Sequence, residues 1–430
     1  MGFWKRTVRE YDLQGKRVLV RVDYNVPIAD DGYITDDYRI QQSLPTLQYL
    51  LEQGCSIVLC SHLGRPDGPD DESCSLRPVA ERLAVLFNRE VKFAKDCIGE
   101  STQGQVSNLQ PGDILLLENL RYHDEEEAND DNFAKQLAEH GEVFVQDGFG
   151  VVHRAHASTD AIAHFLPSVA GLLLEKEVGT IADVMSHPDR PLMAVVGGAK
   201  VSDKIDILNR FIDIADIVAI GGAMANIFLY AKGVAVGKSK MNLEDVPLAE
   251  QIIEKAEQKA RKTNFVLYIP QDGVVARGID SDAKTRIVDW GSHVIADIES
   301  YPKKPQDGRV MLGENEMILD IGPYSGAFIA GAIQLVQTVI WNGAMGVTET
   351  KGLQGPIGPF SHGTETVVEA MLGQFGNRPF SLVGGGDTVG YIQNRGLIDA
   401  FNHVSTGGGA SLELMSGKSL PGVQALWDKE

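Results

Sequence analysis

Residues 195–204 read VVGGAKVSDK, and this stretch decides the fold class. Its apolar start is typical of a buried strand. The two glycines that follow let backbone N–H groups approach an anion closely. If a helix begins at this point, Lys200 and Lys204 lie one turn apart on the same face. Two ammonium groups beside a glycine turn suit a phosphate group, and they do not suit a hydride acceptor or a peptide.

Short runs of β-branched residues recur on both sides of this stretch and alternate with longer segments of helical spacing. Such alternation is typical of βαβ units and parallel sheets, and the runs are too many for one sheet. We therefore expect an α/β protein with two doubly wound parallel-sheet domains of Rossmann type, joined by a long helix, with an active-site cleft between them. The expected strands are residues 17–22, 56–60, 114–118, 143–146, 192–196, 217–220, 265–269, 338–341 and 380–383, and the expected helices include 131–140 and 248–262.

The connection between the two domains is predicted near residues 167–187, PSVAGLLLEKEVGTIADVMSH. A long helical pattern there runs into Pro188 and Pro191, and proline after a helix is a stop signal. We expect a first domain at 1–168, a linker helix at 169–187, a second domain at 188–404 and a C-terminal segment at 405–430.

The composition of the chain argues against several classes of protein, among them nucleic-acid-binding, membrane and zinc proteins. The 430 residues are 43% hydrophobic, enough for two cores, and the formal net charge of -20 disfavours nucleic acid or an anionic membrane as a partner. The four cysteines, Cys55, Cys60, Cys74 and Cys97, form no C-x-x-C pair, so reduced thiols are expected and a zinc site is not. The first residues have no apolar signal core, and no apolar run reaches transmembrane length, so we expect a cytoplasmic protein.

Unusual polar residues come directly after most of the expected strands. In open α/β sheets, ligands bind at the carboxyl ends of the strands, so each domain is expected to have a functional edge. Arginine binds carboxylate and phosphate groups with paired hydrogen bonds. Each arginine alone could be an ordinary surface ion pair, but the set indicates a small, multiply charged anion. The first half supplies Arg39, His62, Arg65, Arg121, His153, Arg154 and His156.

The second half supplies glycine turns rather than arginines. Residues 384–388, GGGDT, and 405–409, STGGG, each precede a plausible helix, and helix N-termini bind phosphates through free N–H groups. Asp387 beside such a turn is suited to hold Mg²⁺ directly or through water. One glycine triplet alone is commonly a tight turn, but two triplets together with the stretch at 195–204 favour a nucleotide site.

Two common nucleotide motifs are missing. Residues 233–239 are one residue too short for a Walker loop, and no glycine cluster fits G-x-G-x-x-G. The pattern instead predicts a phosphotransferase with a nucleotide on one domain and a small polyanion on the other, which closes to exclude water. No general base is evident, and none is required if the acceptor oxygen is already a carboxylate.

The chain resembles the phosphoglycerate kinase family, nearly from end to end. The resemblance rests on motifs that occur in the family's order: RVDYNVP at 21–27, SHLGRP at 61–66, ENLR at 118–121, HRAHAS at 153–158, GGAKVSDK at 197–204, WNG at 341–343, GGGDT at 384–388 and STGGGAS at 405–411.

The resemblance implies reversible transfer of a phosphoryl group between 1,3-bisphosphoglycerate and ADP, giving 3-phosphoglycerate and ATP with Mg²⁺. It implies a monomer, whose residues 405–430 return to the first domain. The implied catalytic residues are Arg39, Lys200 and Gly408. The implied 3-phosphoglycerate residues are Asp23, Tyr24, Asn25, Arg39, His62, Leu63, Gly64, Arg65, Arg121 and Arg154. The implied nucleotide residues are Gly198, Lys200, Lys204, Gly222, Asn342, Glu349, Gly385, Gly386, Asp387 and Thr388, with Asp387 as the metal ligand.

The chain departs from the family's usual pattern at a few positions, and none of them removes a charged catalytic group. Ala344 stands where the family usually has proline, and Thr348 where it has phenylalanine. These changes bear on nucleotide affinity more than on activity. Two other functions are compatible with such a scaffold: a binding protein that keeps the scaffold without catalysis, and a kinase for a different acyl phosphate. The presence of Lys200, Arg39 and Asp387 disfavours the first, and the number of arginines disfavours the second.

Overall fold

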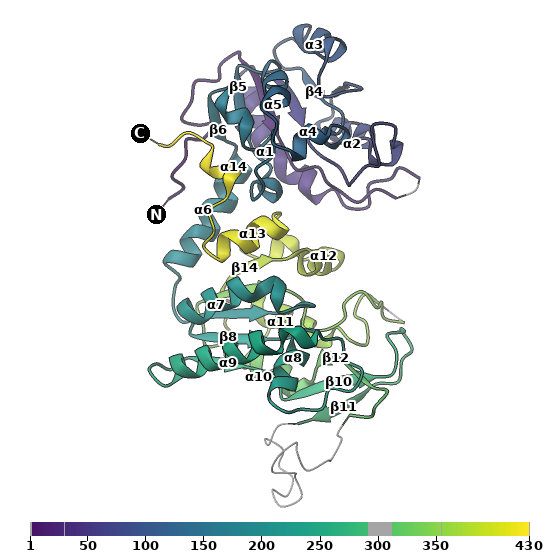
Figure 1. Ribbon diagram of the computed structural model, residues 1–430, viewed down its shortest axis with the longest axis vertical. Coiled ribbons are helices and arrows are strands. Elements are labelled where there is room, and N and C mark those ends of the chain that lie inside the picture. Colours follow the sequence, from purple (N-terminus) through teal and green to yellow (C-terminus); the bar gives the residue numbers. More distant parts are fainter. Residues whose placement is uncertain (1, 30, 291–311, 354, 430) are drawn as a thin grey trace, which may run out of the picture. The chain divides into compact units, whose positions relative to one another are not determined.

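The computed structural model describes residues 2–29, 31–290, 312–353 and 355–429 (Figure 1). The chain divides into two compact units. Unit 1 comprises Met1–Asp183, Gly409–Leu414 and Lys418–Glu430, and unit 2 comprises Val184–Gly408 and Met415–Gly417. Among the described residues, none of the helices combines the length and apolar character needed to span a bilayer.

Unit 1 is built on a six-stranded sheet in the order β3-β4-β2-β1-β5-β6, in which every neighbouring pair is parallel. The middle of the sheet is apolar and buried, as expected for a parallel sheet covered on both faces. Its strands are β1 Arg17–Arg21, β2 Ser56–Cys60, β3 Lys92–Phe93, β4 Ile114–Leu116, β5 Val143–Gln146 and β6 Ser168–Ala170, and its helices are α1 Tyr38–Glu52, α2 Arg77–Phe87, α3 Glu100–Ser107, α4 Asp124–Glu127 and α5 Asp131–Ala138.

Unit 2 contains a second six-stranded parallel sheet, in the order β15-β14-β13-β7-β8-β9. The prediction of two parallel α/β sheets is therefore confirmed. The strands are β7 Leu192–Val196, β8 Ile217–Ile220, β9 Val266–Tyr268, β13 Thr338–Asn342, β14 Phe380–Gly384 and β15 His403–Val404, and the helices are α7 Ile205–Ile214, α8 Ala225–Ala231, α9 Val246–Ala260, α10 Pro323–Ile333, α11 His362–Met371 and α12 Gly386–Asn394.

A third, three-stranded antiparallel sheet in unit 2 was not predicted. It runs in the order β11-β10-β12, with β10 Asp272–Ala276, β11 Arg286–Asp289 and β12 Met317–Ile321. These strands are short and carry charged residues, and no helical segment separates β10 from β11. The alternation that reveals βαβ units therefore does not reveal them.

The predicted linker helix at 169–187 was wrong at its start. Residues Ser168–Ala170 form strand β6, because they pair in parallel with β5, and helix α6 covers Leu172–Ser186. The backbone N–H groups of Leu173 and Leu174 donate to Oδ1 of Asp147, at 3.0 and 3.3 Å. Asp147 follows β5, so its carboxylate ties the start of α6 to the central sheet.

The end of the chain contacts its beginning within unit 1. The Lys5 ammonium lies 2.7 Å from Oδ1 of Asp428 and donates to the carbonyl oxygen of Leu426 at 2.8 Å. The N–H of Trp427 donates to the carbonyl oxygen of Ser168, at 3.0 Å. Helices α13 Gly408–Met415 and α14 Pro421–Gln424 lead into this segment.

Asp147 generates a prediction about pH. Burial raises the pKa of Asp147 from its ordinary value of 3.8 to about 7, against the hydrogen bonds that it accepts. Because the folded protein holds this proton more tightly than the unfolded chain does, the stability from this group is lost progressively as the pH rises from about 4 to about 7. Asp147→Asn should therefore be nearly equal in stability to the wild type at pH 4, and more stable than it at pH 8 by on the order of 3–4 kcal/mol. Urea unfolding at the two pH values measures this, and an equal difference at both would contradict it.

Candidate active site

The carboxyl ends of β1, β2, β4 and β5 form the candidate substrate edge of unit 1. Asp23 and Asn25 follow β1, His62 follows β2, and Arg121 follows β4 by way of the 3-10 turn η2, Leu120–Tyr122. Most of the residues predicted for the small anion therefore meet at one edge of a single sheet, as the parallel topology requires.

Asp23 and Arg39 form an ion pair at this edge. Nη1 of Arg39, on α1, lies 2.9 Å from Oδ2 of Asp23 and also donates to the carbonyl oxygen of Asn25 at 3.3 Å. Burial alone would raise the pKa of Asp23, but the charge of Arg39, with smaller contributions from other cations, holds it below its ordinary value. The side chain of Arg39 remains 31% exposed, so part of its guanidinium is free to meet an anion.

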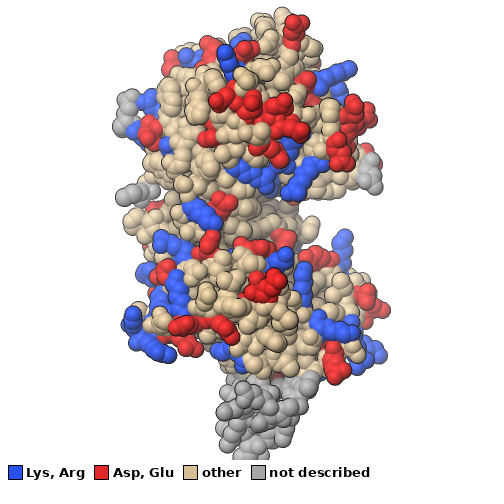
Figure 2. Space-filling view, in the orientation of Figure 1, with Lys and Arg blue, Asp and Glu red and all other residues tan. Residues whose placement is uncertain are grey.

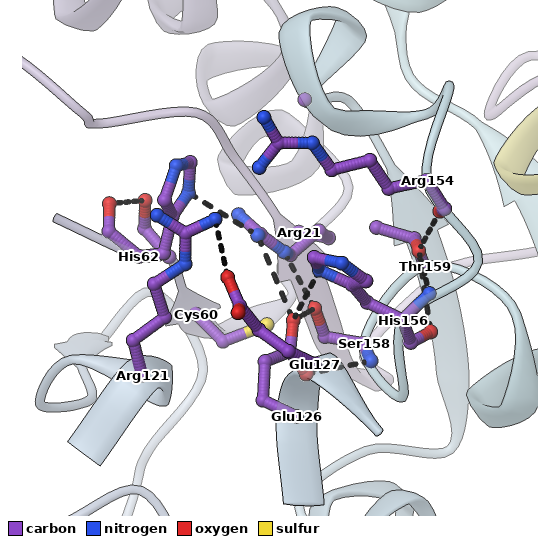
Figure 3. Close-up of polar contacts among 12 residues, drawn as sticks. Arg21, Cys60, His62, Arg121, Glu126, Glu127, Arg154, His156, Ser158 and Thr159 are labelled. Atoms are coloured by element: carbon purple, nitrogen blue, oxygen red, sulfur yellow. Dashed lines mark hydrogen bonds and ion pairs between the residues drawn. The ribbon is translucent and has the colours of Figure 1, made fainter. Parts of the chain in front are cut away.

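Arg21, at the end of β1, carries the most buried guanidinium of the edge, with 1% of the side chain exposed. Figure 3 shows it reaching toward Ser158, Glu126 and His62. Nε donates to Oγ of Ser158 at 2.7 Å, and that hydroxyl donates to Oε1 of Glu126 at 2.6 Å. The Arg21 Nη2 atom lies 3.9 Å from the same carboxylate oxygen. A buried cation is therefore balanced by a buried anion, mostly through a serine hydroxyl.

His62 is a neutral hydrogen-bonding residue of this edge rather than a cation. Burial, together with the neighbouring arginines, lowers its pKa well below the ordinary value, although Asp23 opposes the shift. Nη2 of Arg21 faces its Nδ1 at 3.4 Å, and a guanidinium can only donate. Nδ1 is therefore the acceptor, and Nε2 carries the proton.

The loop after β2 is held by side chains of the edge itself. Oδ1 of Asn25 accepts from the N–H of Gly64 at 2.9 Å, and Nη1 of Arg121 donates to the Gly64 carbonyl oxygen at 2.6 Å. Oδ1 of Asn119 accepts from the N–H of Leu63, at 3.1 Å. The backbone N–H groups of Leu63 and Gly64, two predicted substrate residues, are therefore already used within the protein.

Two predicted arginines have no carboxylate partner in the part of the chain that the structure describes. Arg65 is exposed. The guanidinium group of Arg154 donates from Nε to Nε2 of His153, at 3.3 Å. Tyr24 behaves differently, because its side chain is fully buried and its hydroxyl lies 2.8 Å from Oγ of Ser43. Only the backbone of Tyr24 is positioned at the edge.

Glu126 is the residue of this edge that sequence reasoning missed. An acidic run such as DEEE at 124–127 is typical of a solvated loop or a first helical turn. The run does form α4, but Glu126 is 1% exposed. Burial raises the pKa of Glu126, against the charge of Arg21 and the hydrogen bonds from Ser158. The sequence signal was indirect: Arg21 ends an otherwise apolar strand, and a buried arginine requires an anion.

The second candidate edge, in unit 2, is made of glycine turns after β7, β8, β13 and β14. A Cβ on Gly197 would lie 2.0 Å from the carbonyl oxygen of Ala344, and one on Gly343 would lie 2.3 Å from the carbonyl oxygen of Gly197. Gly343 also has a φ of 102°, which favours glycine. The loops after β7 and β13 therefore touch through their backbones. Gly198 and Gly222, both predicted for the nucleotide, lie in the same group of turns.

The two lysines of the opening stretch lie in different settings. The expected helix does not begin at Lys200, because the chain first forms a glycine turn and the short 3-10 turn Ser202–Lys204 before α7. Lys204 donates to the carbonyl oxygen of Gly197 at 2.7 Å and to Oδ1 of Asn342 at 2.6 Å. Burial lowers the pKa of Lys204 to about 8, although Asp387 opposes the shift. Lys200 is exposed and has no partner within the described ranges.

Helix α12 begins directly after the glycine turn of β14. Gly385, with a φ of 94°, precedes the helix, and Gly386 and Asp387 are exposed in its first turn. The Thr388 hydroxyl accepts from the N–H of Gly343 at 2.8 Å. Thr388 therefore joins the β13 and β14 loops from a fully buried position.

Two further residues predicted from the sequence, Glu349 for the nucleotide and Gly408 for catalysis, also lie in unit 2, and so does a buried amide nitrogen of Asn342. Glu349 is exposed in the segment after β13, and Gly408 is the first residue of α13. Nδ2 of Asn342 is buried and has no hydrogen-bond partner among the described residues. A buried donor without an acceptor is unfavourable. An oxygen atom of a bound anion would provide the acceptor that this N–H group lacks.

Comparisons with known proteins match this chain to the same family over nearly its full length. The family model for phosphoglycerate kinase matches residues 8–418. The phosphoglycerate kinase of Moorella thermoacetica is 44% identical over 425 residues, and that of Chloroflexus aurantiacus is 46% identical over 428; each alignment covers 99% of this chain and 100% of the relative. The solved structure of phosphoglycerate kinase from Coxiella burnetii has a TM-score of 0.79 at 35% identity and covers 98% of both chains. The chain belongs to the phosphoglycerate kinase family.

The buried contacts among Arg21, Ser158 and Glu126 lead to a prediction about the stability of the fold. Glu126→Ala should lower the free energy of unfolding by about 3 kcal/mol or more, because it leaves a buried guanidinium without its anion. The adjacent change Glu127→Ala is the control, since Glu127 is 55% exposed and its partner Arg121 keeps the hydrogen bond to the carbonyl oxygen of Gly64, so the loss of Glu127 should cost clearly less, about 1 kcal/mol. Urea unfolding of both variants measures the difference, and equal losses would contradict the role given to Glu126.

Proposed function

We propose, from its place in the phosphoglycerate kinase family, that the chain transfers a phosphoryl group reversibly between 1,3-bisphosphoglycerate and ADP, giving 3-phosphoglycerate and ATP. The observation that carries the proposal is the pair of sheet edges, one rich in arginine and one in glycine turns. The face drawn in Figure 2 carries acidic patches on both units with basic side chains beside them, so an anion needs local cations.

The edge of unit 1 is the proposed binding site for 3-phosphoglycerate. Its phosphate and carboxylate suit guanidinium groups that the protein itself leaves unpaired, as at Arg65 and Arg154. Asp23 and Asn25 would accept from the substrate hydroxyl, and the neutral His62 would donate from Nε2. Leu63, Gly64 and Tyr24 would shape the pocket, since their polar backbone or side-chain groups are engaged within the protein.

The glycine turns of unit 2 are the proposed nucleotide site. Exposed N–H groups at the start of α12, from Gly385 and Gly386, suit phosphate oxygens. Lys204 and the unpaired Nδ2 of Asn342 are suited to the same phosphates. Gly198 and Gly222 would allow the base to approach the backbone, and Glu349 would accept from the ribose hydroxyls.

Mg²⁺ is the proposed cofactor, bound together with the nucleotide. The exposed carboxylate of Asp387 beside the phosphate turn is a hard oxygen donor of the kind that Mg²⁺ prefers. One carboxylate fits an ion that takes most of its other ligands from nucleotide oxygens and water. When bound, the ion would neutralise charge on the phosphates.

The chemistry needs alignment and charge neutralisation rather than a base. In the direction of ATP synthesis, an oxygen of the ADP β-phosphate forms a bond to phosphorus as the bond from phosphorus to the acyl oxygen breaks, which leaves a carboxylate. No proton changes place. Arg39 and Lys200 are the proposed cations that meet the moving group, joined by the N–H of Gly408 at the start of α13. We propose that domain closure brings the two ligands together and excludes water.

We also propose a monomer located in the cytoplasm. The glycolytic role of the family supports this location. Size-exclusion chromatography with light scattering tests the monomer, for which the sequence mass is 46.7 kDa. A mass twice as large would overturn it.

A coupled assay with 3-phosphoglycerate and ATP tests the reaction, with NADH oxidation by a dehydrogenase as the readout. We expect turnover that requires Mg²⁺. Folded protein that binds both ligands without turnover would instead support a scaffold that binds only, and turnover with a different carboxylate alone would support another acyl-phosphate kinase.

Arg39→Ala should lower kcat by on the order of 100-fold or more, because it removes a cation from the moving phosphoryl group. The buried carboxylate of Asp23 loses its closest cation, so the free energy of unfolding should fall by on the order of 1–3 kcal/mol, while circular dichroism should show that the variant still folds. Arg261→Ala, which alters a side chain that is 77% exposed directly after the end of α9, is the control and should leave kcat unchanged. An unchanged kcat in the Arg39 variant would remove this residue from the mechanism.

Lys200→Ala should cost about 3–4 kcal/mol of transition-state stabilisation, the loss of one charged donor. The readout is kcat in the coupled assay at saturating substrates. Lys262→Ala, at another exposed lysine, is the matched control. Near-normal turnover in the Lys200 variant would show that Lys200 does not meet the transferred group.

A further inference from the structure

A group of potential metal ligands lies in unit 1, away from the residues proposed for the reaction. Asp96 and Cys97 occupy the loop between β3 and α3, and His123 follows η2 at the start of α4. One ligand atom from each of the three residues, a carboxylate oxygen, the thiol sulfur and a ring nitrogen, lies within 4.8 Å of the other two. Nε2 of His123 lies 2.8 Å from Oδ1 of Asp96.

We propose that Asp96, Cys97 and His123 form a binding site for Zn²⁺ or a similar transition-metal ion, with a fourth position open to solvent. Sulfur, imidazole nitrogen and carboxylate oxygen together suit zinc and cobalt, whereas Mg²⁺ and Ca²⁺ prefer oxygen alone. In a tetrahedral site the ligand atoms are separated by roughly 3.3–3.7 Å, given Zn–N, Zn–O and Zn–S bonds of about 2.0–2.3 Å. The three atoms lie within 4.8 Å of one another, and an ion would have to separate Nε2 of His123 from Oδ1 of Asp96, which are 2.8 Å apart, by about 0.5 Å.

The loop that carries two of the ligands is held by its own hydrogen bonds. The N–H of Cys97 donates to Oδ1 of Asp96 at 2.6 Å, and the Thr102 hydroxyl donates to the carbonyl oxygen of Asp96 at 3.0 Å. Nε2 of His140 lies 3.0 Å from the carbonyl oxygen of Cys97. Contacts of this kind around the ligands fix their orientation and contribute to metal affinity.

The burial of the three residues gives the site an entrance from solvent. Cys97 is fully buried, whereas the side chains of His123 and Asp96 are 25% and 53% exposed, so an ion would enter past these two and meet the sulfur at the inner side.

The site differs from the expectation that the spacing of the cysteines supported. No C-x-x-C pair exists, and the ligands come from two segments that the fold brings together. His123 lies on the segment that also carries Arg121 and Glu126. A bound ion would therefore tie the β3–α3 loop to the segment that supports the substrate edge.

Co²⁺ is the probe, because a tetrahedral thiolate site gives it intense visible bands and a sulfur-to-metal charge-transfer band in the near ultraviolet. The purified full chain, stripped of metal and free of nucleotide, is titrated with Co²⁺ and then with Zn²⁺ as the displacing ion. We expect one equivalent with a thiolate band, displaced by Zn²⁺ but not by Mg²⁺. Cys97→Ser should abolish the charge-transfer band, and His123→Asn and Asp96→Asn should weaken Co²⁺ binding tenfold or more.

Cys74→Ser and His164→Asn are the matched controls. Cys74 is the only cysteine of the four that is not buried, and His164 is an exposed histidine, so both would be the preferred targets of adventitious binding. The proposal is overturned if the wild type shows no thiolate band, if the band survives in the Cys97 variant, or if it is lost in the Cys74 variant. If Cys97→Ser fails to fold, the His123 and Asp96 variants decide, and Co²⁺ affinity equal to that of the wild type in both would overturn the site.

Discussion

A buried positive charge organises the arginine-rich edge. Arg21 ends the central strand β1 with 1% of its side chain exposed, and such a charge is tolerated only with a buried anion and satisfied hydrogen bonds. Glu126 and Ser158 provide these, which places α4 and the segment around residue 158 over the end of the sheet. The same guanidinium holds His62 in one tautomer. Several groups proposed to bind the substrate are therefore positioned by one electrostatic requirement.

The glycine edge of unit 2 depends on a different constraint, the close approach of backbones. The turns after β7 and β13 touch at distances that exclude a Cβ, and Lys204 crosses them to reach Gly197 and Asn342. A rigid group of N–H donors costs little reorganisation when a phosphate binds. Arginine side chains on one edge and backbone donors on the other thus suit two different anions.

Much of the fold could be predicted from the sequence, because buried parallel strands read as β-branched runs between helical segments. Each of the nine expected strands exists in the structure. The misses have local causes. No helix separates β10 from β11, and Ser168–Ala170 reads as the start of α6 although it pairs with β5. The sequence shows which charged residues follow the strands, but it does not show which residues pair with them in the folded protein. Glu126 lies in an acidic run whose composition is typical of a solvated segment, although the side chain is buried, and the cluster of Asp96, Cys97 and His123 exists only after folding.

We propose that the edge of unit 1 recognises a small polyanion through guanidinium groups that the protein leaves unpaired. Calorimetric titration of the wild type and of Arg154→Ala with 3-phosphoglycerate, without nucleotide, is the decisive measurement. We expect saturable binding to the wild type, weakened about tenfold or more in the variant by loss of a charged hydrogen-bond donor. Equal affinity of the two proteins, or no binding to the folded wild type, would contradict it.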